Sequence, residues 1–122
     1  MMRLNAYFTG NVTVRYSGSK MWTSIGDISH FIKQNGKFSI YSKYISSLSG
    51  NRRTCDGWAL DTPALRTLRL TSEGYSGSIS FNSSISNPTY QNLDEINISN
   101  TAINLSLSNV PLRKLYATAG SA

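Results

Sequence analysis

A short unit recurs along this chain: a stretch that alternates apolar and polar residues, a turn rich in Ser, Asn or Gly, and a second alternating stretch. Residues 65–70 and 77–81 form one pair, residues 93–98 and 103–107 form the next, and residues 112–117 begin another. Such alternation is typical of strands that bury one face. Its repetition predicts a stack of coils that presents a surface, and it argues against a single catalytic pocket.

The composition agrees with short strands rather than long helices. Ser, Thr and Asn are abundant and only 15% of the residues are charged; small polar side chains bond to the local backbone and compete with the helical hydrogen bonds. A length of 122 residues with 39% hydrophobic content suits one domain. We divide this domain, residues 1–122, into irregular coils with insertions over 1–62 and regular repeat coils over 63–122.

Aligning the units predicts first strands near residues 4, 38, 68, 96 and 115, and second strands near residues 12, 45, 79 and 105. A short helix is expected over residues 28–33, where the apolar residues have helical spacing and Gly36 follows. Residues 37–49 fit either a strand pair or a helix, because the apolar spacing matches both periods over so few residues. Residues 50–60 are interpreted as a polar, basic excursion closed by Trp58 and Leu60.

The net charge of +6 favours anionic partners, although the basic residues are spread along the chain. The single cysteine, Cys55, cannot form an internal disulfide, and no cluster of Cys and His indicates a metal site or another cofactor. No apolar run is long enough for a signal peptide or a transmembrane segment. We therefore expect no cofactor and no contact with a membrane.

The sequence offers no catalytic group of residues. Asp94 and Glu95 are adjacent in an expected strand, so their side chains would point to opposite faces and could not act as an acid/base pair. The only histidine, His30, could join Cys55 in a nucleophilic site with Asp27 as the orienting carboxylate, but no local signature of such a site is present. We expect a protein that is not an enzyme, has no catalytic residues and takes no small-molecule substrate.

Residues 63–120 resemble the leucine-rich repeat family, in particular the short, Ser/Asn-rich kind found in bacterial surface proteins and in phage proteins. The resemblance rests on the Leu-x-x-Ile-x-Ile strand at residues 93–98, on Ser99-Asn100, and on the Leu-Ser-Leu-Ser-Asn return at residues 105–109. It implies a curved parallel sheet, a ladder of Asn or small polar residues that bonds to the backbone, and a role in binding macromolecules. The expected fold is therefore mainly β, a small leucine-rich-repeat-like β-solenoid with short helical or loop insertions.

Residues 49–58, Ser-Gly-Asn-Arg-Arg-Thr-Cys-Asp-Gly-Trp, resemble a Ser-Gly-Lys-Arg-Lys-x-x-x-Gly-Trp segment that recurs in phage proteins and beside DNA-binding modules of homing endonucleases. In that reading residues 25–60 form a helix-turn-helix-like module, Arg52 and Arg53 contact phosphate, and Trp58 packs beneath the loop. The alternative is an exposed insertion loop that Trp58 anchors in the core.

We expect a non-enzymatic protein–protein interaction or structural module, located in a phage virion as a capsid- or tail-associated component or in the host cytoplasm. Its partners would be other protein subunits in a homo- or hetero-oligomeric assembly, with a small phage nucleic-acid-binding protein as the alternative. Exposed aromatic and basic side chains suit an interaction surface. The candidate residues for that surface are Tyr75, Tyr90, Arg113, Lys114 and Tyr116.

Overall fold

The computed structural model describes residues 11–16, 24–25, 28–32 and 36–117. Over these residues the protein is mainly β, with two five-stranded sheets whose strand pairs are all parallel. Sheet A contains, in spatial order, β1 (Val12–Tyr16), β3 (Gly36–Ser42), β5 (Thr54–Asp61), β7 (Gly74–Asn82) and β9 (Ala102–Ser108). Sheet B contains, in spatial order, β10 (Lys114–Tyr116), β8 (Glu95–Asn97), β6 (Thr67–Leu70), β4 (Ser47–Gly50) and β2 (Ser24–Ile25).

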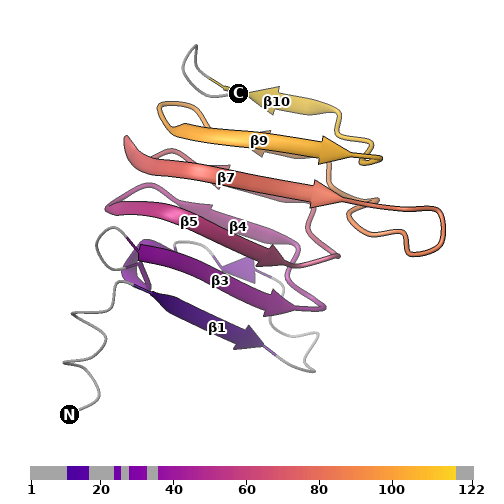
Figure 1. Ribbon diagram of the computed structural model, residues 1–122, viewed down its shortest axis with the longest axis horizontal. Helices are drawn as coiled ribbons and strands as arrows, with labels where there is room; N and C mark the ends of the chain where they lie inside the picture. Colours follow the sequence, from indigo (N-terminus) through magenta and orange to yellow (C-terminus); the bar gives the residue numbers. More distant parts are fainter. Residues whose placement is uncertain (1–10, 17–23, 26–27, 33–35, 118–122) are drawn as a thin grey trace.

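The chain visits the two sheets alternately. Each odd-numbered strand lies in sheet A, and the even-numbered strand that follows it lies in sheet B. We call such a pair a rung, from β1–β2 at one end of the sheets to β9–β10 at the other. Figure 1 shows the strands of sheet A stacked in sequence order with their arrows pointing the same way, while β10 runs in the opposite direction.

Most of the strand positions predicted from the sequence are strands, but their grouping into sheets was partly wrong. The position near 38 was expected to align with those near 68, 96 and 115, whereas Phe38 lies in sheet A and the other three lie in sheet B. The position near 45 precedes β4 of sheet B. Strands of both sheets alternate apolar and polar residues in the same way, so the repeat alone does not indicate which sheet a strand joins. The position near 4 lies outside the described residues.

Strand β5 is a second correction, because residues 50–60 were expected to form an excursion. Residues 54–61 instead form a strand that pairs with β3 along most of its length and with β7 at Thr54 and Cys55. The register against β3 shifts between Gly36 and Lys37, and this bulge interrupts the alternation that identifies a strand in a sequence.

The segments for which a helix was considered contain little helix. The helix expected over residues 28–33 is reduced to the 3₁₀ turn η1 (Ile28–His30), and residue 33 lies outside the described residues. Residues 37–49 form most of β3 and β4, so the helical alternative for this segment is wrong. No helix in the described part of the chain is long and apolar enough to cross a bilayer.

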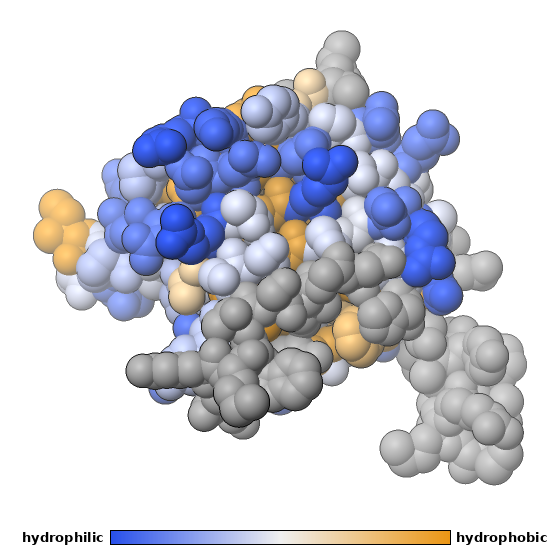
Figure 2. All heavy atoms as spheres, turned by 180° about the vertical axis from the view of Figure 1, so that it is seen from behind, coloured by the Kyte–Doolittle hydropathy of each residue, from blue (hydrophilic) through white to orange (hydrophobic). Residues whose placement is uncertain are grey.

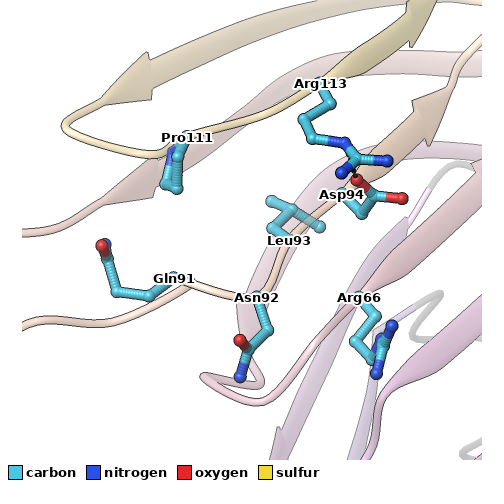
Figure 3. A pocket seen from close by; sticks show the side chains of 7 residues that line it. All are labelled: Arg66, Gln91, Asn92, Leu93, Asp94, Pro111 and Arg113. Carbon is cyan, nitrogen blue, oxygen red and sulfur yellow. Dashed lines mark ion pairs between the residues drawn. The ribbon is translucent and has the colours of Figure 1, made fainter.

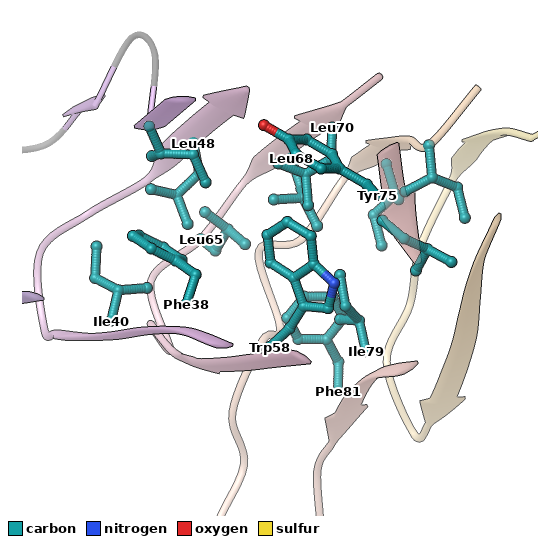
Figure 4. Packing of buried hydrophobic residues seen from close by; sticks show 14 of the residues in the cluster. Phe38, Ile40, Leu48, Trp58, Leu65, Leu68, Leu70, Tyr75, Ile79 and Phe81 are labelled. Atoms are coloured by element: carbon teal, nitrogen blue, oxygen red, sulfur yellow. The ribbon is translucent and has the colours of Figure 1, made fainter. Parts of the chain in front are cut away.

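A hydrophobic core lies between the two sheets and receives side chains from both (Figure 4). Phe38, Trp58 and Phe81 enter it from sheet A, and Leu48 and Leu68 enter it from sheet B. Trp58 packs edge-on against Tyr75, with the ring centroids 5.1 Å apart. Burial of these apolar faces is the main force that holds the sheets together.

Small polar side chains close the corners that lead from sheet B back to sheet A. The hydroxyl of Ser72 donates to the carbonyl oxygen of Arg53 at 2.7 Å and accepts the amide of Gly74 at 3.1 Å. At the next corner the hydroxyl of Thr101 donates to the carbonyl oxygen of Ile98 at 2.7 Å. Buried backbone groups at the corners thereby find partners, which accounts for part of the Ser and Thr content.

Candidate protein interface

The apolar columns of the core lose their cover at the last rung. One column crosses sheet B in register, and its members from β4 to β10 are Leu48, Leu68, Ile96 and Leu115. The first three are at most 1% exposed, whereas Leu115 is 52% exposed. In sheet A, Phe81 of β7 is fully buried, but its register partner Leu107 of β9 is 37% exposed. These side chains have the residue type of a core position, and no rung in the described part of the chain covers them.

The outer sides of β9 and β10 form what we call the terminal edge. In the described part of the chain, each of these strands has a neighbouring strand on one side only. A groove of about 190 Å³ lies at this end and is lined by Ile98, Leu105, Leu107, Leu115 and Ala117. Unpaired backbone groups beside an apolar groove are the arrangement to which another β-strand adds.

A ladder of four residues runs along the corner where the chain enters sheet B. These residues, which we call the corner ladder, are Ser46, Arg66, Asp94 and Arg113. The carbonyl oxygen of each of the first three accepts hydrogen bonds from the amide of the next ladder residue and from the amide that follows it. The N···O distances lie between 2.8 and 3.2 Å. The carbonyl oxygen of Arg113 accepts no such bond from any described residue.

The charges of the corner ladder alternate from rung to rung. The Nε of Arg113 lies 2.8 Å from Oδ1 of Asp94; the Arg113 side chain is 73% exposed and that of Asp94 is 34% exposed. Arg66 stands on the other side of Asp94 in the ladder. An open pocket of about 390 Å³ lies beside these three residues and is also lined by Asn92 (Figure 3). The sequence of charges is positive, negative, positive, and it ends on Arg113.

The neighbouring row of sheet B ends in the same way. Thr67, Glu95 and Lys114 are in register on β6, β8 and β10, so the acidic residue again stands one rung before a basic one. Figure 2, which views the molecule from behind, shows hydrophilic residues over much of the coloured surface, with hydrophobic atoms visible between them. The last rung therefore combines two basic side chains with an uncovered apolar column.

Two of the five predicted interaction residues belong to the core instead of the surface. Tyr75 is fully buried, and its hydroxyl donates to the carbonyl oxygen of Arg52 at 2.8 Å. Tyr90 is 7% exposed, and its hydroxyl bonds to the carbonyl oxygen of Leu60 and accepts the amide of Thr62. Burial raises the pKa of Tyr90 above its ordinary value. The hydroxyl of each ring finds a backbone partner inside the fold, which lets a tyrosine occupy a core position.

The structure brings the other three predicted interaction residues together at the last rung. Arg113 directly precedes β10, and Lys114 and Tyr116 lie in that strand. All three are exposed, and Tyr116 is 49% exposed.

The residues of the nucleic-acid hypothesis are placed differently from what that hypothesis requires. Trp58 is a core residue, and its indole Nε1 donates to the carbonyl oxygen of Ser76 at 2.7 Å. Arg52 and Arg53 are exposed at a corner between β4 and β5, and Nη1 of Arg53 donates to the carbonyl oxygen of Ile32 at 3.1 Å. Within residues 25–60, where this hypothesis requires a helix-turn-helix-like module, the described residues contain the 3₁₀ turn η1 and, over most of residues 37–49, strands β3 and β4 in place of a helix.

Cys55 points into the core. It is 1% exposed, and its Sγ lies 3.2 Å from the carbonyl oxygens of Gly36 and Gly57. Burial raises the pKa of this thiol, which disfavours the nucleophilic thiolate. Among the described residues no three His, Cys, Asp or Glu side chains lie close enough to hold a metal ion.

Sequence reasoning missed the residues that define the terminal edge. Leu107 and Leu115 look like any other strand residue in the repeat, because their exposure depends on which strands neighbour them and not on their own type. The residues Arg66, Asp94 and Arg113 each directly precede a strand of sheet B. Their charges are visible in the sequence, but their alternation along one ladder follows only from the register, which the sequence does not supply.

No protein-family model, curated protein or solved structure matches this chain.

Proposed function

We propose that this protein is a non-enzymatic protein–protein interaction or structural module, built as a short parallel β-solenoid, that docks on a protein partner through its terminal edge. The observation that carries the proposal is the exposure of Leu115, at 52%, at the end of a column whose other members are at most 1% exposed. A further rung would bury this side chain and pair the outer backbone groups of β9 and β10.

The solenoid assignment rests on the alternation of strands between two parallel sheets and on the recurrence of the corner ladder from rung to rung. Solenoids act through surfaces, because each rung contacts only its neighbours and no deep pocket forms. The relation to leucine-rich repeats stays a prediction that rests on the sequence motifs at residues 93–109.

The proposal is tested with a synthetic copy of residues 93–108, which we call the rung peptide; it carries the sequence of β8, from one rung, and of β9, from the next. We expect the fluorescently labelled peptide to bind the full chain, as measured by fluorescence anisotropy. The Leu115→Asp variant should abolish binding, because it places a charge in the groove. The matched control is Ser80→Asp, which places the same charge on an exposed position of β7 away from the groove.

Circular dichroism should give the same spectrum for all three proteins, because Leu115 and Ser80 are exposed. If the rung peptide does not bind the wild-type protein, or binds the Leu115→Asp variant equally well, the terminal edge is not a docking surface and the proposal fails.

We also propose that the chain is a structural component of a phage virion. This part is supported by the resemblance of residues 63–120 and 49–58 to phage-type sequences and by the suitability of an interaction module for assembly. Mass spectrometry of purified particles of the virus that encodes the chain should find it in stoichiometric amounts. Its absence from intact particles would remove this assignment.

Nucleic-acid binding remains an alternative from the charge of +6 and the exposed Arg52 and Arg53. It predicts DNA or RNA binding that weakens steeply with salt and is reduced in an Arg52→Ala, Arg53→Ala double variant. Absence of binding at low salt rejects it.

A further inference from the structure

The charges and the apolar side chain of the last rung indicate the chemistry of its partner. We infer that the terminal edge accepts, in parallel, a β-strand of another protein that begins with two acidic residues followed by alternating apolar residues. This inference rests on the proposed function and names the partner for the same surface.

The corner ladder repeats a fixed hydrogen-bonding pattern. The carbonyl oxygens of Ser46, Arg66 and Asp94 each accept two successive amides from the next rung, and that of Arg113 is the next acceptor in the series. A docked strand that continued the pattern would donate two successive amides to Arg113. The first of those residues would then take the ladder position above Arg113, and the second would stand above Lys114.

The charges of Arg113 and Lys114 also constrain the incoming strand. Asp94 pairs with Arg113 from one side at 2.8 Å, and Glu95 is in register with Lys114 on the same side. On the other side, in the described part of the chain, these two basic side chains have no neighbouring rung. Like charges on directly adjacent strands are unfavourable, and opposite charges are favourable. The two incoming positions are therefore best filled by Asp or Glu.

The apolar column of sheet B constrains the position that follows. After the two acidic positions, the incoming strand would place its third residue above Leu115, which is 52% exposed and needs an apolar cover. The partner strand thus has the pattern acidic, acidic, apolar, any residue, apolar. Residues 94–98 of this chain, Asp-Glu-Ile-Asn-Ile, have this pattern, and they already occupy the opposite side of β10.

A second copy of this chain fits the terminal edge less well. Head-to-tail stacking would place β2 above β10, and residues 21–25, Met-Trp-Thr-Ser-Ile, contain no acidic residue. Both copies would also carry a net charge of +6. Charge complementarity therefore favours a different, acidic protein.

The experiment compares two rung peptides on the full chain: residues 93–108 as they stand, and the same peptide with Asp94→Asn and Glu95→Gln. We expect the acidic peptide to bind roughly three- to tenfold more tightly at low salt, since exposed ion pairs contribute modestly. The preference should disappear at 1 M salt, where the Debye length is about 3 Å. It should also disappear in an Arg113→Gln, Lys114→Gln variant of the protein, whereas an Arg69→Gln control should retain it.

The outcomes separate this inference from the proposed function. If both peptides bind with equal affinity, the terminal edge is a docking surface but the acidic partner is wrong. If neither binds, the docking surface itself is wrong. If sedimentation velocity finds concentration-dependent oligomers that Leu115→Asp abolishes, the occupant is a second copy and the acidic strand is overturned.

Discussion

The indole nitrogen of Trp58 donates a hydrogen bond to the carbonyl oxygen of Ser76 at 2.7 Å, which ties β5 to β7 through a side chain. Between these two strands the register holds only at Thr54 and Cys55. The bond therefore supplies a contact between neighbouring rungs where the backbone ladder is short.

Replacing Trp58 with Phe should lower the free energy of unfolding by about 1–3 kcal/mol, because the partly buried carbonyl of Ser76 loses its donor. Urea denaturation followed by circular dichroism measures the change. Tyr116→Phe serves as the control and should stay within about 0.5 kcal/mol, since that ring is 49% exposed. Equal stability of the Trp58→Phe variant and the wild type would show that the bond is unimportant.

Gly77→Ala should destabilise the protein by about 1–3 kcal/mol or more. Gly77 has a φ of 88°, and an added Cβ would lie 2.2 Å from the carbonyl oxygen of Asp56. That neighbour is backbone, so it cannot rotate away as a side chain would. The adjacent Ser78→Ala is the control, because Ser78 is exposed. Thermal unfolding of both variants is the measurement, and a Gly77→Ala midpoint equal to that of the control would contradict the geometry.

Replacing leucine with alanine should lower the free energy of unfolding by different amounts at two positions of the apolar column in sheet B. Leu68→Ala should lower the free energy of unfolding by about 2–5 kcal/mol, because Leu68 is 1% exposed and its removal leaves a cavity. Leu115→Ala should change the free energy by less than about 1 kcal/mol, because Leu115 is half-exposed. Chemical denaturation of the two variants at equal protein concentration tests this difference. Similar losses would mean that Leu115 is covered in solution.

Stability should decrease at alkaline pH through Cys55. Burial raises the pKa of its thiol in the folded state, so the unfolded chain ionises first. The protonated thiol therefore contributes fully to the free energy of unfolding below the ordinary thiol pKa of about 8.5. This contribution is lost as the pH rises through the raised pKa of the folded state. Urea denaturation between pH 7 and about 9, where tyrosine with its ordinary pKa of about 10 is still largely protonated, should show this fall in the wild type.

Cys55→Ala is the control for the pH dependence, because it removes the titrating group. Its stability at pH 7 should be lower than that of the wild type, but its loss between neutral and alkaline pH should be smaller. Parallel profiles for the two proteins would assign the alkaline loss to other groups.

The regular strand pattern of residues 63–117 determined that this protein is mainly β, because alternation every second residue is a local property that each strand carries in its own sequence. The existence of strands near residues 68, 79, 96, 105 and 115 followed from it. Only the tertiary structure decided which strand belongs to which sheet. It also decided that residues 54–61 form a strand and that residues 37–49 are strand and not helix. Those features depend on register and on which neighbouring strand is present.

The same distinction applies to the candidate interface. The sequence supplied the basic and aromatic residues 113, 114 and 116, but it could not separate them from Tyr75 and Tyr90, whose hydroxyls find backbone partners inside the core. Leu115 and Ile96 are equivalent in sequence pattern, but among the described residues Ile96 has a strand on both sides and is buried, whereas Leu115 has one on a single side and is exposed. Exposure is a property of neighbours, and neighbours distant in sequence are fixed only when the chain has folded.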